Sequence, residues 1–222
     1  MDVLERFIDD NEVLRALGNA VRGQIMTAIP VRVVQDSDGH TAALQPLVKA
    51  VKRNADGSQE LVDFPMIPSA PVNFASGGGL TSTMPIRSDD VGYALVMSRS
   101  IDVYQQQGNQ QPQIDVRMHD LSDAVYCPGL KPDPQKLKNV SGTSAQTRTD
   151  DHKTVSDWSD TGITHAREDA VHNTSAGGIM AALKGALLSV TGKGIAASKG
   201  GSSHVVVDGA VSSLAPKVLL NC

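Results

Sequence analysis

The last quarter of the chain contains no aromatic residue, and this feature most narrows what the chain can fold into. All seven Phe, Tyr and Trp residues lie before position 159, whereas residues 175–222 contain eight glycines. Large side chains normally fill the core of a globular domain, so this stretch cannot build such a core alone. It must stay loose or bury small side chains against identical copies of itself.

Short apolar runs recur near the end of the chain, at 205–207, 210–214 and 218–220. Asp-Gly, Ser-Ser and Ala-Pro-Lys separate or interrupt them. This spacing predicts very short strands with sharp corners, as in a β-helix or prism, and small residues suit an inner axis where three chains meet.

The longest apolar run, 177–197, is interrupted by Lys184 and Lys193 and does not predict a transmembrane span. An alternative reading makes this run an amphipathic insert of a membrane-active protein.

Charge and cysteine content exclude several classes of protein. The net charge of -4 gives no reason to expect a nucleic-acid partner, which would favour a basic face. Cys127 and Cys222 do not make a disulfide framework, which favours a reduced, cytoplasmic setting. The acidic N-terminus has no apolar core of a signal peptide, so we expect none.

The patterning along the chain predicts a mainly β fold in four segments. Residues 1–23 contain apolar residues at helical spacing, which predicts an amphipathic helix whose stripe needs a partner. Residues 24–128 alternate short β-rich runs with turn clusters, which predicts an antiparallel OB-like barrel of about five strands. A Pro-rich linker follows at 129–142, and 143–222 form the C-terminal strand-rich module.

Candidate site residues are few, and each has an ordinary structural explanation. His165, Asp169 and His172 would share one face if their segment were helical and could then hold a divalent metal. The Thr, Ser and Gly residues nearby favour a solvated polar segment instead. Asp89-Asp90 fits turn chemistry, and Asp120 with Asp123 fits a capping role, rather than paired acids for glycoside cleavage. The chain has no phosphate loop, nucleophile elbow or His-Glu-x-x-His motif, so we expect no enzyme, no catalytic residue and no bound cofactor.

Several segments, taken in order, resemble one family. Their order is more specific than any single piece, and the likeness covers roughly residues 24–132. This part of the chain resembles the N-terminal OB-fold domain of the membrane-piercing central spikes of contractile-tailed phages, which form the Gp138-like or baseplate assembly protein V group. The most telling pieces are Gln45-Pro46, Pro85-Ile86 with Asp89-Asp90, Arg99-Ser100-Ile101-Asp102, and His119-Asp120-Leu121-Ser122-Asp123.

The resemblance implies a homotrimer in the virion, at the tail baseplate, assembled in the host cytoplasm. Its OB domains would contact tail hub proteins, and its C-terminal chains would intertwine as a trimeric β-helix that transiently contacts the host outer membrane. Many such spikes end in a His-x-His tip that binds iron, but this motif is absent here. His204 is the only late histidine and would be the candidate for an axial metal, although an outward polar residue at a strand start is the simpler reading. We therefore expect a blunt end completed by a separate small tip protein, or a tail that folds back. The alternative is an OB-fold module for single-stranded nucleic acid.

Overall fold

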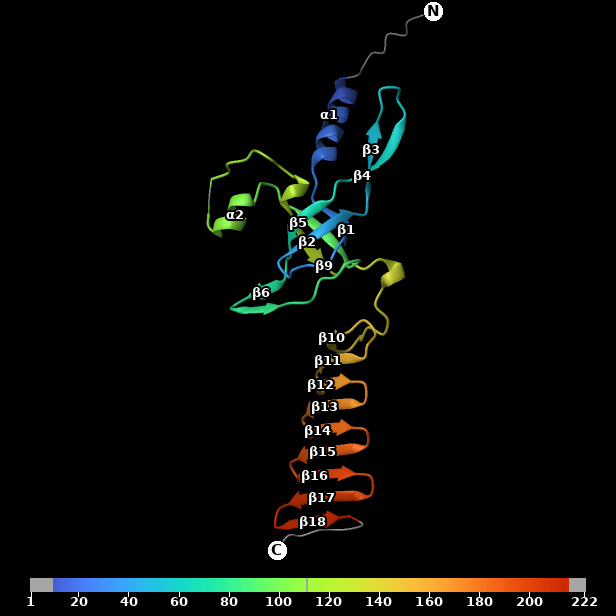
Figure 1. Cartoon of the computed structure of the whole chain (residues 1–222), viewed down its shortest axis with the longest axis vertical. Coiled ribbons are helices and arrows are strands. Elements are labelled where there is room, and N and C mark those ends of the chain that lie inside the picture. Colours follow the sequence, from blue (N-terminus) through green and yellow to red (C-terminus); the bar gives the residue numbers. More distant parts are fainter. Residues whose placement is uncertain (1–9, 111, 216–222) are drawn as a thin grey trace, which may run out of the picture. The chain divides into compact units, whose positions relative to one another are not determined.

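The structure is a computed structural model that describes residues 10–110 and 112–215. It is mainly β, as the sequence predicted, and divides into two compact units, Met1–Gln135 and Lys136–Cys222. Figure 1 shows a curled sheet with a helix in the first unit and a ladder of strands in the second. Residues 1–9 of the predicted helix, and Cys222, lie outside the described residues.

The helix α1 (Asp10–Gln24) carries an apolar stripe that its own unit does not cover. Leu14, Leu17 and Val21 are 64%, 61% and 52% exposed. A single helix of this length containing Gly18 and Gly23 is marginal in water. The apolar stripe of α1 is therefore not covered by the rest of its unit, although the sequence predicts that it packs against a partner.

Five strands of the first unit form the strongly curled sheet. Its strand order is β5-β2-β1-β8-β9. Val72, just after β5, makes a parallel bridge to Tyr126 of β9, and the Asn73 amide donates to the Tyr126 carbonyl oxygen at 2.8 Å. The two edge strands thus meet, which gives the partly open five-stranded barrel of the OB-fold kind. The bounds are β1 (Ala28–Val33), β2 (Thr41–Pro46), β5 (Ile67–Pro71), β8 (Val91–Val96) and β9 (Ala124–Pro128).

The barrel contains the hydrophobic core of the first unit. Tyr126, Leu44 and Val31 are its largest fully buried apolar side chains. Burial raises the pKa of Tyr126 to about 12, with the Asp90 charge as a smaller cause. Gly92 is required beside this ring, because a Cβ there would lie 2.6 Å from Tyr126 Cε2 and 2.4 Å from the Cys127 carbonyl oxygen.

Two hairpins and one long excursion leave the barrel. The hairpins are β3 (Lys49–Arg53) with β4 (Gln59–Asp63), and β6 (Ala75–Gly77) with β7 (Leu80–Ser82). The apolar run 41–51 is divided after Pro46 between β2 and the start of β3. The excursion contains α2 (Asp102–Gln107) and the 3₁₀ turn η1 (Leu121–Asp123), and the 3₁₀ turn η2 (Asp133–Gln135) ends the unit.

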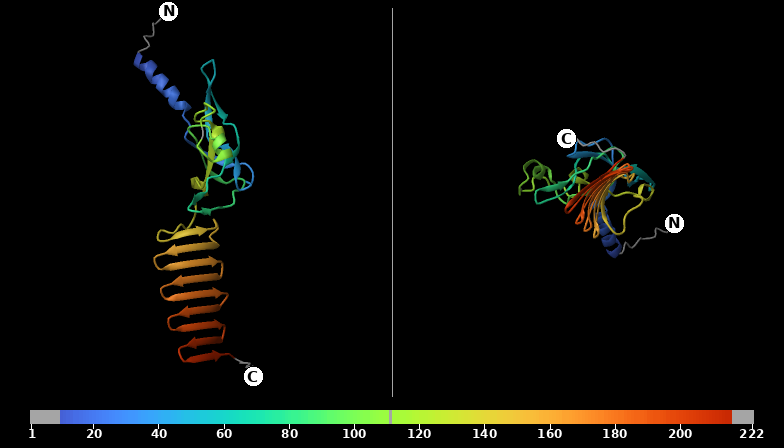
Figure 2. Two further views of the ribbon diagram at one scale, coloured as in Figure 1. Left: turned by 90° about the vertical axis from the view of Figure 1, so that its left-hand side faces the viewer. Right: turned by 90° about the horizontal axis from the view of Figure 1, so that it is seen from below.

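The second unit is one antiparallel meander of nine strands, paired in sequence order. From β11 onward a new strand begins every eight residues, and two-residue turns connect the strands. Figure 2 shows the strands stacked as rungs. The bounds are β10 (Ala145–Arg148), β11 (Thr154–Ser159), β12 (Gly162–Arg167), β13 (Ala170–Ser175), β14 (Gly178–Leu183), β15 (Ala186–Thr191), β16 (Gly194–Lys199), β17 (Ser202–Val207) and β18 (Ala210–Leu214).

The predicted short strands with tight turns are therefore present, and the runs 205–207 and 210–214 fall in β17 and β18. Residues 218–220 lie outside the described part. Strands also occupy the polar stretch before 175, within the module predicted for 143–222. Intertwining concerns three chains and stays a prediction.

Candidate functional site

The C-terminal sheet has two open faces and no core. Not one described residue between 136 and 215 is buried. Stable domains pack at least two layers of secondary structure around a core. The sheet therefore presents a large surface that is unsatisfied in a single chain, and this surface is the candidate functional site.

The strand register decides which side chains share a face. Directly paired residues of antiparallel strands lie on the same side of the sheet. Trp158 pairs with Ile163, Ile163 with Thr174, and the series continues strand by strand to the end of the sheet. We call the side that contains this row face 1 and the opposite side face 2. The row consists of Trp158, Ile163, Thr174, Ile179, Val190, Ile195, Val206 and Val211.

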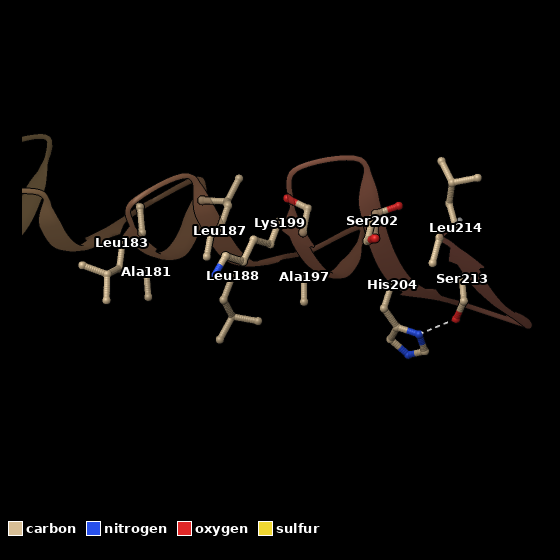
Figure 3. Close-up of a pocket in the computed structure, with 15 residues that line it drawn as sticks. Ala181, Leu183, Leu187, Leu188, Ala197, Lys199, Ser202, His204, Ser213 and Leu214 are labelled. Carbon is tan, nitrogen blue, oxygen red and sulfur yellow. Dashed lines mark hydrogen bonds between the residues drawn. The ribbon is translucent and has the colours of Figure 1, made fainter. Parts of the chain in front are cut away.

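Face 1 has the longer row of large apolar side chains, and a further row at the strand ends contains Arg167 and Lys199. Its large apolar side chains are between 36% and 66% exposed in the single chain. A second row beside the first contains Ser156, His165, His172, Ala181, Leu188, Ala197, His204 and Ser213. A shallow open hollow along the sheet is lined by residues of both faces. In Figure 3, Leu188, Ala197 and His204 point to one side of the sheet while Leu187 and Leu214 point to the other.

Face 2 is richer in small and polar side chains. Asp157 accepts hydrogen bonds from Ser144 Oγ at 2.6 Å and from Gln146 Nε2 at 2.5 Å. The Ser144 bond first, then the Gln146 bond, lowers the pKa of Asp157. Asn173 Nδ2 donates to Thr164 Oγ1 at 2.8 Å. These groups suit a surface that stays in water.

Three glycines hold alternate strands close to their neighbours. A Cβ at Gly162, Gly178 or Gly194 would lie 2.2–2.4 Å from a carbonyl oxygen of the next strand. The positions are sixteen residues apart, one hairpin repeat. Larger residues there would force neighbouring strands apart.

The structure places the predicted metal residues in a β-hairpin, not on a helix. His165 in β12 is paired with His172 in β13, whereas Asp169 lies in the turn between them. His204 was expected at the start of a strand, but it lies inside β17. Its Nδ1 is 2.7 Å from Ser213 Oγ. Within 10–110 and 112–215, no three His, Cys, Asp or Glu side chains gather as metal ligands.

The acidic pairs of the barrel have structural roles. Asp120 caps η1 by accepting from the Ser122 amide at 2.8 Å, as the sequence predicted, and the two Ser122 hydrogen bonds lower the pKa of Asp120. The Asp90 carboxylate accepts from the Arg87 amide at 2.7 Å within its turn.

Sequence reasoning missed the role of Arg117. Its guanidinium contacts Asp102 and Asp115 and lies 3.7 Å from Asp123, which is 1% exposed. The hydrogen bond to Asp102, the largest cause, raises the pKa of Arg117. Asp123 Oδ1 also accepts from the Ile101 amide at 2.9 Å. This network fastens both ends of the excursion to the barrel.

The run 177–197, considered above as a membrane insert, forms β14, β15 and part of β16. No helix in the described part of the chain has the length and apolar content to cross a membrane.

Comparison with known proteins identifies a domain within the first unit. A family model described as the phage protein Gp138 N-terminal domain matches residues 29–129, which cover all five barrel strands except Ala28. A search of curated proteins found no match. The match covers the barrel and the Arg117 excursion, the same region that the resemblance singled out. Residues 29–129, a little under half of the chain, therefore form a Gp138-like N-terminal domain, which supports a structural role in a phage baseplate.

Proposed function

We propose that the chain is the central spike of a contractile phage tail, in which three copies associate through their C-terminal sheets. The observation that carries this proposal is a nine-stranded sheet without one buried residue among those described. A single layer with an apolar face in water is unstable, and identical copies offer the same face.

In the proposed trimer, three sheets turn face 1 inward and form a triangular prism. A six-residue strand spans about 20 Å, which sets the width of one side. The row from Ile163 to Val211 then fills the interior with slender side chains, and Trp158, the one aromatic residue of the row, lies at its first strand. Face 2, with Asp157 and Asn173, stays in water.

This arrangement suits a piercing function. Sheath contraction would supply the force, and the spike must only stay folded while it reaches the host outer membrane. Apolar contacts between chains resist peeling, so the trimer unfolds slowly. The barrel would bind the tail hub, and a separate small tip protein would complete the spike.

The nucleic-acid alternative has less support. Such a barrel needs aromatic side chains that are free to stack on bases. Tyr126 is fully buried, and Tyr93 on β8 is 37% exposed. Several cations, Arg32, Lys49 and Arg117, face carboxylates.

Immunogold electron microscopy of purified phage particles tests the proposal. Antibodies raised against residues 136–222 should label the centre of the baseplate, with access increased where the sheath has contracted. Label on the capsid, along the sheath or on tail fibres would contradict the proposal.

A further inference from the structure

Two histidines face each other across the hairpin β12–β13. His165 is directly paired with His172, and their rings stack with centroids 6.4 Å apart and planes inclined by 24°. Both side chains are exposed on face 1. Directly opposed side chains of neighbouring strands lie close enough to interact.

The neighbours of the pair orient one ring and leave room for the other. Ser156 lies beside His165 in the same row, and its Oγ is 2.9 Å from His165 Nδ1. When Nδ1–H donates to this oxygen, the lone pair is on Nε2. An outer hydrogen bond of this kind fixes the tautomer of many metal-binding histidines. On the other side, His172 is paired with the small residue Ala181, so its ring can turn.

We propose that His165 and His172 together bind one late first-row divalent cation, of the class Zn²⁺, Ni²⁺ or Cu²⁺. Neutral imidazole is a preferred ligand for these ions. Small rotations of the two rings direct both lone pairs to one ion at metal–nitrogen bonds of about 2.0–2.1 Å. Water completes the coordination, and Asp169 takes no part. Both ligands come from one chain, so the site does not need the proposed trimer, although that trimer would place it on the inward side of the sheet.

His204 provides a matched control in the same row. Its Nδ1 has the same type of contact, with Ser213 Oγ, which is the dashed line in Figure 3. Its paired neighbours are Ala197 and Ser213, so it lacks a second imidazole. His204 therefore separates the effect of two opposed histidines from that of one exposed histidine.

Calorimetric titration of the full chain, without a polyhistidine tag, with Zn²⁺ and then Cu²⁺ tests the proposal. We expect one ion per chain, and a loss of affinity of about tenfold or more in either His165→Ala or His172→Ala. Ser156→Ala should weaken binding by about tenfold because it removes only the outer hydrogen bond. His204→Ala should leave the affinity unchanged.

A gain of binding completes the test. Ala197→His places an imidazole opposite His204 and should add a second ion per chain. Circular dichroism should show unchanged strand content in every variant. The proposal is overturned if the native chain binds no ion, if binding survives both His165→Ala and His172→Ala, or if His204→Ala abolishes it. Light scattering on the same samples reports chain association independently, so a failed metal site and a failed trimer remain distinguishable.

Discussion

Replacing Ile195 with alanine tests whether face 1 is the packed face. Ile195 lies between Val190 and Val206 in the apolar row and is 46% exposed in one chain. Complete burial of an isoleucine side chain contributes about 1.5–3 kcal/mol, so burying the exposed half contributes about 1 kcal/mol. Three copies lose about 3 kcal/mol together, which is roughly a 150-fold fall in the association constant of the trimer.

Sedimentation equilibrium over a range of protein concentrations measures this fall. The matched control is Leu187→Ala on the adjacent strand, because Leu187 is 39% exposed but lies on face 2. We expect the control to associate like the native chain. If Leu187→Ala weakens association and Ile195→Ala does not, face 1 is not the interface and the prism is wrongly oriented.

Three further predictions concern single side chains. Gly178→Val should destabilise the sheet by about 1–3 kcal/mol in thermal melts, since a Cβ there would lie 2.2 Å from the Val190 carbonyl oxygen. Gly192→Ala should be nearly neutral in the same melts, because a Cβ at Gly192 would meet open space. Asp123→Ala should lower the free energy of unfolding by about 3 kcal/mol, measured with denaturant. The substitution leaves the Ile101 amide without its acceptor and removes a buried carboxylate near Arg117. An equal effect of Asp115→Ala, which removes an exposed partner of Arg117, would refute this account. Asp157→Asn should lower the melting temperature at pH 7, and the difference from the native chain should shrink in acid. The lowered pKa of Asp157 means that its contribution is present above the unfolded value near 3.9 and is lost as the pH falls through the folded value; a difference that grows in acid would contradict this sign.

Much of the first unit could be predicted from the sequence because its signals are local. Turn clusters such as 36–40 and 54–58 mark hairpins, and alternation marks the strands between them. The capping role of Asp120 is likewise decided within three residues. Arg117 was missed because its carboxylate partners lie up to fifteen residues away, and only the folded excursion brings them together.

Simple alternation of apolar and polar residues in the sequence could not show which residues share a face of the C-terminal sheet. Successive members of the apolar row, such as Trp158, Ile163, Thr174 and Ile179, are separated alternately by five and eleven residues, because the chain reverses at each turn. The same reversal brings His165 opposite His172, which neither a helical nor a plain strand pattern predicts. One sequence signal was available: the dipeptide Gly-Ile recurs at 162–163, 178–179 and 194–195, a sixteen-residue repeat of one hairpin.

The mass of the full chain in solution tests the central claim most directly. Multi-angle light scattering should give about three times 23.4 kDa, and this mass should persist on dilution. A stable particle of 23.4 kDa with intact strand content would contradict the account, because the sheet would then be stable without any partner for face 1.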